Sequence, residues 1–248
     1  MGVESTEGAP VDRVEGAPVG RRVVLGMLGL GTAGVLFGSR AADALSRLLA
    51  PVTAADPTGL SSLVPAAGGF RIYSVVGFLP KKADADYRLR VTGLVDRPVT
   101  LTLADLESMT PTSLTKDFQC VTGWRVRDVP WVGVQLSEVL AAAGVQPAAR
   151  AVRFHSFDNV YTETLTLTQA RRPDVLVAYT MQDRRIPARH GGPVRLYVAP
   201  MYGYKSLKWL DEIEVVADRA DDPGYWEVRG YDTDAWIGRS NGRDDAPV

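Results

Sequence analysis

The order of short strand and helix patterns after Phe70 most restricts what this 248-residue chain can fold into. Residues 87–95 alternate between apolar and polar side chains, and residues 174–181 form an unbroken apolar run, so both segments predict strands. Strand patterns outnumber helix patterns and do not alternate regularly with them. The sequence therefore predicts an α+β fold with mixed or antiparallel sheets and short helices, in one domain over residues 70–218.

Two helices are expected from their end signals. Thr102 precedes Asp105 by three residues, a spacing typical of a capping box at a helix start. A second helix is expected from Ser137, as its cap, to Gly144. The other strand patterns are 151–157 and 161–167, which flank a turn at Asp158-Asn159, together with 194–200 and 213–217.

Composition and motifs exclude several function classes. The net charge is −1 and the basic residues are scattered, so we expect no nucleic-acid binding. No Gly-x-Gly-x-x-Gly joins a strand to a helix and there is no Walker loop, so dinucleotide and nucleoside-triphosphate chemistry have no support.

The N-terminal segment has the composition of an export signal. Residues 1–20 contain the repeat Glu-Gly-Ala-Pro-Val twice, at 7–11 and 15–19, which is typical of a disordered leader. Arg21 and Arg22 then precede a glycine-rich apolar run, a pattern that favours a twin-arginine signal for proteins that fold before export. We expect export across the bacterial cytoplasmic membrane to the periplasm or cell envelope.

The apolar run at 23–38 leaves open whether the signal is cleaved after export or stays as a membrane anchor. Sixteen residues make about 24 Å of helix, short of the roughly 30 Å hydrocarbon core. Gly20 replaces the usual Ser or Thr, and no clear Ala-x-Ala cleavage site follows, so an uncleaved membrane anchor is an alternative, and an ordinary buried helix a weaker one. We expect residues 1–50 to be the leader with its signal or anchor, 51–69 a linker, and 219–248 a C-terminal extension or tail.

Cys120 is the only cysteine in the chain. A single cysteine excludes an internal disulfide, Cys-x-x-Cys redox chemistry, thiolate-ligated iron–sulfur clusters and Cys-x-x-Cys-His haem attachment. With only two histidines and no His-Glu-x-x-His spacing, any transition metal must bring most of its own ligands. A lone cysteine is usually a small buried hydrophobe, but this one lies where a strand enters a turn, where its thiolate can serve as a soft metal ligand.

A second unusual stretch, 189–214, is rich in glycine, proline and cationic side chains. The cationic candidates are Arg189, His190, Arg195, Lys205 and Lys208. Arginine, lysine and backbone N–H groups form a natural cradle for phosphate or another anion. A solvated basic loop before a core strand explains the same pattern, and both interpretations stay open at this point.

The two stretches together resemble the molybdopterin-binding oxidoreductases, the family of sulfite oxidases and the periplasmic methionine sulfoxide reductase catalytic subunit. The resemblance runs from about Phe70 to Ala217 and predicts a sulfite-oxidase-type fold. Its motifs are Cys-Val-x-x-Trp at 120–124, Pro-Trp-x-Gly at 130–133, Gly-x-Pro-x-Arg-Leu at 191–196 and Tyr-Gly-x-Lys-Ser-x-Lys at 202–208.

The resemblance implies a role for each matching residue. Cys120 would be the catalytic thiolate ligand of molybdenum, whose other ligands are the pterin dithiolene and oxo groups. The residues implied to bind the cofactor are Tyr73, Ser74, Ser156, His190, Arg195, Ser206, Leu207 and Lys208. His190 stands where the reductase branch commonly has Asn, and Lys205 is a neighbour whose role is not separable from that of Lys208.

Departures from the family favour the reductase branch over sulfite oxidation. Val-Thr-Gly-Trp follows the cysteine where sulfite oxidases carry a Gly-Asn-Arg-Arg-like run, and about thirty residues follow Ala217 where they add an immunoglobulin-like domain. We therefore expect oxygen-atom transfer on an S-oxide or a related small substrate. The alternatives are sulfite oxidation and, in another class, a cofactor-free exported module that binds an anion.

The sequence also bears on the source of the electrons and on the residues around the substrate. No haem or flavin motif is present, so a membrane cytochrome or quinol-linked protein is the expected electron-transfer partner. Trp124, Trp131, Tyr202 and Tyr204 are candidate pocket walls or, equally, core aromatics. Arg125 and Arg127 are candidates for steering a polar substrate, or else belong to a solvated loop.

Overall fold

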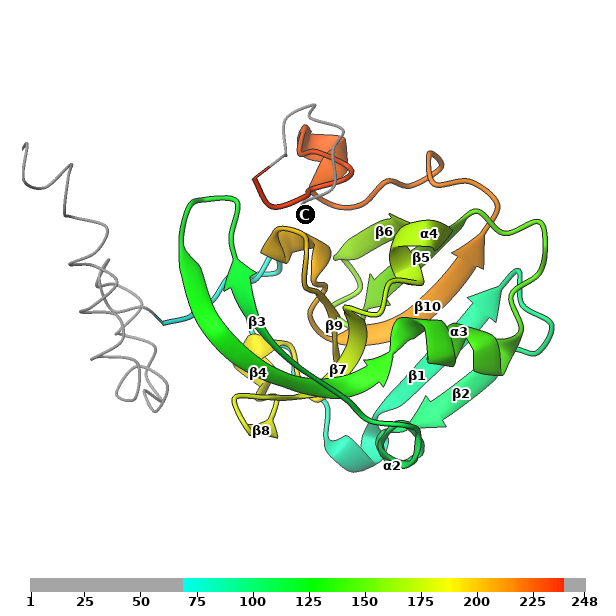
Figure 1. The fold of residues 1–248 in the computed structure, drawn as a ribbon, viewed down its shortest axis with the longest axis horizontal. Helices are drawn as coiled ribbons and strands as arrows, with labels where there is room; N and C mark the ends of the chain where they lie inside the picture. Colours follow the sequence, from blue (N-terminus) through cyan, green and yellow to red (C-terminus); the bar gives the residue numbers. More distant parts are fainter. Residues whose placement is uncertain (1–68, 239–248) are drawn as a thin grey trace, which may run out of the picture.

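The computed structural model describes residues 69–238, which form two five-stranded sheets (Figure 1). The first sheet has the strand order β2–β1–β10–β5–β6. Strands β1 and β10 pair in parallel and the other neighbours are antiparallel, so the sheet is mixed. Its strands are β1 (Arg88–Gly93), β2 (Val99–Thr102), β5 (Ala151–Ser156), β6 (Thr162–Thr166) and β10 (Leu210–Val216).

The second sheet is antiparallel, in the order β3–β4–β7–β8 with β9 also paired to β7. Its strands are β3 (Thr112–Gln119), β4 (Arg125–Gln135), β7 (Val175–Met181), β8 (Arg184–Arg185) and β9 (Arg195–Val198). The long β3–β4 hairpin curves along one side of the molecule (Figure 1). Mixed and antiparallel sheets with short helices confirm the α+β prediction.

The position of β7 between two hydrophobic cores explains the unbroken apolar run in its sequence. Val175 and Val177 pack into the larger core, which also contains Leu89 of β1 and Ile213 of β10. Leu176 and Ala178 pack into a second core under the β3–β4 hairpin. Both faces of the strand are therefore buried, and alternation of polar and apolar residues is lost.

The short helices are α2 (Leu103–Ser108), α3 (Leu136–Ala143) and α4 (Leu167–Ala170). The capping box at Thr102 and Asp105 is present, with side-chain and backbone groups satisfying each other in both directions. The predicted cap at Ser137 is wrong. The cap is Gln135, two residues earlier, because Leu136 is fully buried and anchors the first turn in the core. The predicted end at Gly144 is confirmed by its φ of 74°.

Residues 219–238 cross the end of the first sheet after β10 (Figure 1). Isolated bridges pair Gly224 with Glu163 of β6, and Trp236 with Met201. Ala235 is fully buried and Trp236 is 8% exposed. This part of the expected C-terminal extension therefore packs on the domain as one of its walls.

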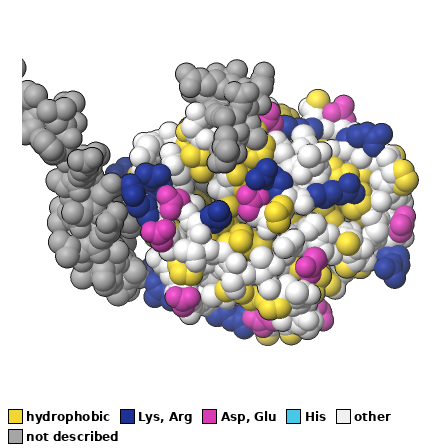
Figure 2. Space-filling view, viewed as in Figure 1, with side chains coloured by type: hydrophobic (Ala, Val, Ile, Leu, Met, Phe, Trp, Pro, Cys, Tyr) yellow, Lys and Arg dark blue, Asp and Glu magenta, His cyan; other side chains and the backbone are white. Residues whose placement is uncertain are grey.

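The predicted leader, the apolar run at 23–38 and the linker lie outside the described residues. Between residues 69 and 238 no helix is both long and apolar enough to cross a membrane. On the face shown in Figure 2, basic and acidic side chains are interspersed, without a continuous area of one sign.

Candidate active site

A pocket of about 350 Å³ brings most of the predicted site residues together. It is bordered by residues 70–75, the β3–β4 turn, the loop after β9 and the C-terminal segment. The predicted residues that line it are Tyr73, Ser74, Cys120, His190, Arg195, Ser206 and Lys208. Ser156 and Leu207 are not in the lining. The Ser156 hydroxyl accepts from the Asp158 N–H at 3.2 Å, and Leu207 is part of the larger core.

Cys120 lies in the tight turn between β3 and β4. Its N–H donates to the Trp124 carbonyl at 2.9 Å, and its carbonyl accepts from the Gly123 N–H at 3.0 Å. Gly123 has a φ of 95°, a conformation that glycine adopts without strain. The Thr122 hydroxyl donates to the Cys120 sulfur at 3.2 Å. The turn thus presents a half-buried thiol to the pocket with one hydrogen-bond donor already directed at it.

Arg195 supplies a buried positive charge at the start of β9. Its guanidinium donates to the carbonyls of His190 and Ser206, both at 2.7 Å, and the residue is 1% exposed. No carboxylate within residues 69–238 pairs with it at salt-bridge distance, and burial lowers the pKa of Arg195 to about 10. A buried guanidinium held only by neutral carbonyls still has charge to offer an anion.

Lys208 adds a second cation beside Arg195. Its ammonium donates to the Tyr73 carbonyl at 2.9 Å, which ties the N-terminal side of the pocket to the loop after β9. Burial, and after it the charge of Arg195, lowers the pKa of Lys208 to about 7. An anion bound here would raise that pKa again, because an opposite charge favours the ammonium form.

His190 is neutral at this cationic end of the pocket. Burial, and then the charges of Arg195 and Lys208, lower the pKa of His190 to about 3. Its Nε2 accepts from the Arg189 guanidinium at 3.3 Å, so Nδ1 carries the proton. The ring packs edge-on against Phe70, with 5.1 Å between ring centroids. His190 can therefore offer a ligand a neutral hydrogen bond but no charge.

Five aromatic side chains of the pocket lining pack against one another, and we call them the aromatic wall. They are Tyr161, Tyr204, Tyr225, Trp226 and Tyr231. Successive rings pack with centroids 5.1 to 5.6 Å apart, in the order 161, 225, 226, 231, 204. The Tyr161 hydroxyl donates to the Tyr204 carbonyl at 2.5 Å and closes the series. The wall is continuous, with one end at Tyr161, just before β6, and the other at Tyr204, in the 3₁₀ turn Gly203–Lys205.

The aromatic predictions divide between wall and core. Trp124 and Tyr204 line the pocket. Trp131 does not, since it is fully buried and stacks on Tyr197 with a 4.1 Å centroid separation. Tyr202 is also outside the lining, as are Arg125, which pairs with Asp117 at 3.5 Å, and Arg127.

Four members of the wall, Tyr161, Tyr225, Trp226 and Tyr231, and the lining carboxylate Asp158 were missed by sequence reasoning. Only the packing of the C-terminal segment against β6 brings the last three of these aromatic residues to the pocket. The aromatic density of Gly-Tyr-Trp-Glu-Val-Arg-Gly-Tyr at 224–231 was a signal in the sequence, in a region taken for an extension.

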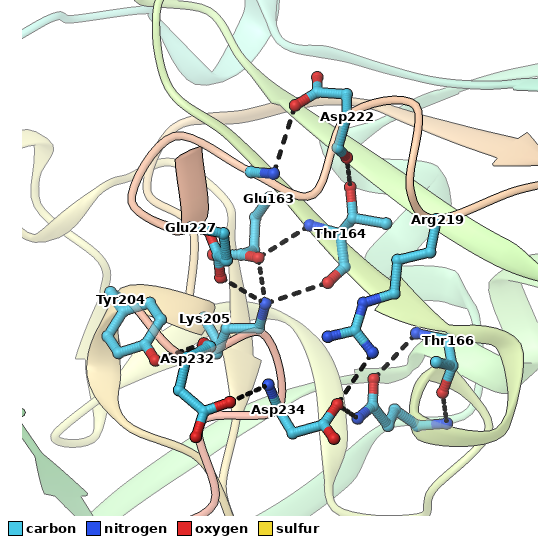
Figure 3. A network of polar contacts seen from close by, with 12 residues as sticks. Glu163, Thr164, Thr166, Tyr204, Lys205, Arg219, Asp222, Glu227, Asp232 and Asp234 are labelled. Atoms are coloured by element: carbon cyan, nitrogen blue, oxygen red, sulfur yellow. Dashed lines mark hydrogen bonds and ion pairs between the residues drawn. The ribbon is translucent and has the colours of Figure 1, made fainter. Parts of the chain in front are cut away.

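The structure also separates Lys205 from Lys208. Lys205 points away from the pocket and contacts Glu163 and Glu227 (Figure 3). It is fully buried and absent from the lining, whereas Lys208 lines the pocket.

The lining fits a large polar ligand that carries an anionic group and needs one thiolate. Trp124 Nε1 and Asp158 Oδ2 are buried without a hydrogen-bond partner among the described residues, so both have capacity for a ligand. Arg195 and Lys208 offer charge for a phosphate, and Cys120 offers sulfur. Within residues 69–238, no group of three or more His, Cys, Asp or Glu side chains is placed to hold a metal ion. These are the properties expected of a pocket for a pterin-bound metal that brings most of its own ligands.

Fold and site together define an α+β protein whose pocket presents buried cationic side chains and a single thiol. The family described as "Oxidoreductase molybdopterin binding domain" matches residues 76–226. The chain belongs to this family of molybdopterin-binding oxidoreductases.

Known proteins resemble the chain over the same region. An uncharacterized oxidoreductase, YuiH, of Bacillus subtilis is 33% identical, covering 58% of this chain and 72% of that protein. Sulfite oxidase of Arabidopsis thaliana is 30% identical over 58% of this chain and 45% of its own length. The methionine-sulfoxide reductase catalytic subunit MsrP of Ralstonia nicotianae is 31% identical over 57% and 46%. The chain thus spans less than half the length of the latter two.

The fold has a solved counterpart. The sulfane dehydrogenase SoxCD of Paracoccus pantotrophus superimposes with a TM-score of 0.51 and 23% identity, over 56% of this chain and 40% of that one. At this identity the match concerns the fold alone, and it confirms the expected sulfite-oxidase-type architecture.

Proposed function

We propose that the chain binds a molybdenum–molybdopterin cofactor in this pocket and transfers an oxygen atom to or from a small organic substrate, reducing an S-oxide as its main activity. The observation that carries the proposal is the presence in a single aromatic pocket of one thiol and two cations that have no carboxylate partner among residues 69–238. When bound, the cofactor would supply the two-electron oxygen-atom chemistry of molybdenum between its +4 and +6 states.

The residues of the chain would hold and orient the cofactor. Cys120 would be the protein's ligand to the metal, with its lone pairs directed by the Thr122 hydroxyl. Arg195 and Lys208 would bind the pterin phosphate, with neutral His190 and Ser206 beside it. Tyr73, Ser74 and the neighbouring Ser156 and Leu207 would make or support weaker contacts.

The aromatic wall would contact the organic part of the substrate. Its rings provide apolar surface and few charges, which suits a carbon-bearing sulfoxide better than a small inorganic anion. Sulfite oxidation is the second candidate, supported by the cations Arg195 and Lys208 in the pocket lining, which would attract an anion such as sulfite.

We also place the protein outside the cytoplasm, exported through the paired arginines and either released or anchored by residues 23–38. Its electrons would come from a membrane cytochrome or quinol-linked protein. A purified enzyme with full turnover on soluble donors alone, and no response to membranes, would contradict this partner.

Molybdenum content tests the proposal directly. We expect the protein, expressed in a host that makes the cofactor, to contain close to one molybdenum per chain, and Cys120→Ser to contain at least about tenfold less, because the hydroxyl is a poor ligand for this soft site. Thr110→Ala, an exposed change away from the lining, is the control and should keep its metal. A folded wild-type protein without molybdenum would instead favour the anion-binding module.

Substrate assays on the loaded protein then separate the two enzymatic candidates. We expect reduction of methionine sulfoxide with a dye donor to be faster than oxidation of sulfite with a dye acceptor. The reverse order would make the chain a sulfite oxidase.

A further inference from the structure

Lys205 is the centre of a buried ionic cluster behind the pocket (Figure 3). Its ammonium contacts Glu163 Oε1, lies 2.7 Å from Glu227 Oε1 and donates to the Thr164 carbonyl at 3.1 Å. The three ionic side chains are at most 1% exposed. One lysine therefore joins β6, the 3₁₀ turn Gly203–Lys205 and the 3₁₀ turn Glu227–Arg229, three segments far apart in the sequence.

Each member of the cluster lies within two positions of residues that line the pocket. The cluster side chains themselves are absent from the lining. The lining neighbours are Tyr161 for Glu163, Tyr204 and Ser206 for Lys205, and Trp226 for Glu227. Moving any member would therefore move part of the aromatic wall.

Burying the charges of this cluster costs desolvation free energy. Glu163 Oε2 and Glu227 Oε2 have no hydrogen-bond partner among the described residues, and burial raises the pKa of Glu163. Gly224 has a φ of 130° and approaches both carboxylates so closely that a side chain there would collide with them. Apolar residues of similar volume commonly stabilise a fold at least as well as buried ion pairs, so stability alone is a weak reason for this cluster.

We propose that Lys205 is a positioning residue: by holding Glu163 and Glu227 it fixes the aromatic wall relative to Cys120, and it thereby sets the affinity for substrate. Arg195 and Lys208 make their hydrogen bonds to backbone carbonyls and to no side chain of the cluster, so we expect the cofactor to stay bound when Lys205 is lost. This inference rests on the proposed function in assigning the wall to the substrate.

Two variants separate positioning from stability. Lys205→Met leaves two carboxylates without their cation and is expected to lower the unfolding temperature strongly. The triple variant Lys205→Met/Glu163→Gln/Glu227→Gln removes every charge, so its unfolding temperature should recover much of the loss. If Lys205 positions the wall, the triple variant still shows a KM for methionine sulfoxide raised about tenfold or more, with kcat and molybdenum content within about threefold of wild type.

Lys82→Met is the matched control, because it breaks an ion pair with Asp211 at 2.7 Å outside the pocket lining. Its KM should stay at the wild-type value. A triple variant with wild-type KM and recovered stability would overturn the inference and leave Lys205 with a stabilising role only.

Hydrogen exchange gives a readout that does not depend on turnover. In the triple variant, amides of residues 203–205 and 224–231 should exchange at least about tenfold faster than in wild type, with the amides of the first sheet unchanged. If the wild type binds no molybdenum and turns over no substrate, the proposed function fails, while the exchange result still decides whether Lys205 holds the wall. Unchanged exchange in both segments would overturn the inference.

Discussion

Lys205 and Lys208 are three positions apart in one loop and face entirely different surroundings. Lys205 has two carboxylate partners and no access to the pocket. Lys208 has carbonyl partners, a half-buried position and Arg195 as its cationic neighbour. The 3₁₀ turn Gly203–Lys205 ends at Lys205, and the irregular residues after it place Lys208 at the cavity, which explains how two nearby lysines can serve a buried network and a ligand.

Lys208 should make stability depend on pH. A lysine titrates near pH 10.4 in the unfolded chain and near pH 7 here. Between these values the unfolded chain holds one more proton at this position, so the free energy of unfolding should rise with pH. Urea unfolding of cofactor-free protein at several pH values in this window measures the rise.

Lys208→Met should lose this part of the pH dependence, while the exposed change Lys116→Met should keep it. The same slope in wild type and Lys208→Met would show that Lys208 has an ordinary pKa. Bound phosphate or cofactor should flatten the wild-type slope, since an anion keeps Lys208 charged.

At the scale of elements, short helices and turns in this chain depend on end signals more than on length. Helix α2 has six residues and a complete capping box, and α4 has four residues and another, at Thr166 and Gln169. Helices this short are not stable alone, so their caps and buried faces hold them. Helix α3, with no side-chain cap at Gln135, relies on a buried face that includes Leu136 and Leu140.

Thr102→Ala tests the weight of the capping box. We expect it to lower the free energy of unfolding by about 1 kcal/mol, because the Asp105 N–H loses its side-chain acceptor at the first turn. Thr110→Ala, exposed just beyond the other end of α2, should change it by less than about 0.5 kcal/mol. Equal denaturation midpoints for the two variants would show that α2 is held by its buried face alone.

At the scale of the whole molecule, the C-terminal segment completes both the core and the pocket. Asp234 accepts from Arg219 at 2.8 Å and from Gln169 at 3.0 Å, which ties the segment to α4 (Figure 3). Trp236 packs into the larger core, and Trp226 and Tyr231 line the pocket. The domain that performs the proposed function therefore extends past residue 218.

A chain shortened to end at Asp218 should be destabilised by about 3 kcal/mol or more, on the scale of removing a large buried aromatic side chain. It would also expose Glu163 and Lys205 without Glu227. Thermal unfolding measures the effect, and a chain that ends at Gly238 keeps all the contacts described above and serves as control. Equal unfolding temperatures for the two shortened chains would mean that residues 219–238 add nothing to stability.

The sequence by itself determined the strand-rich α+β class, the capping box at Thr102 and the separate candidacies of Cys120 and Arg195, since each depends on residues close together in the chain. It also determined the family, through motifs whose residues are closely spaced. Only the tertiary structure decided that Trp131 belongs to the core, that Lys205 is kept out of the pocket lining, and that aromatic residues of the C-terminal segment join the pocket wall. Those outcomes depend on which distant segments pack together. A local pattern of polar and apolar residues does not specify which segment lies on the other side of the core.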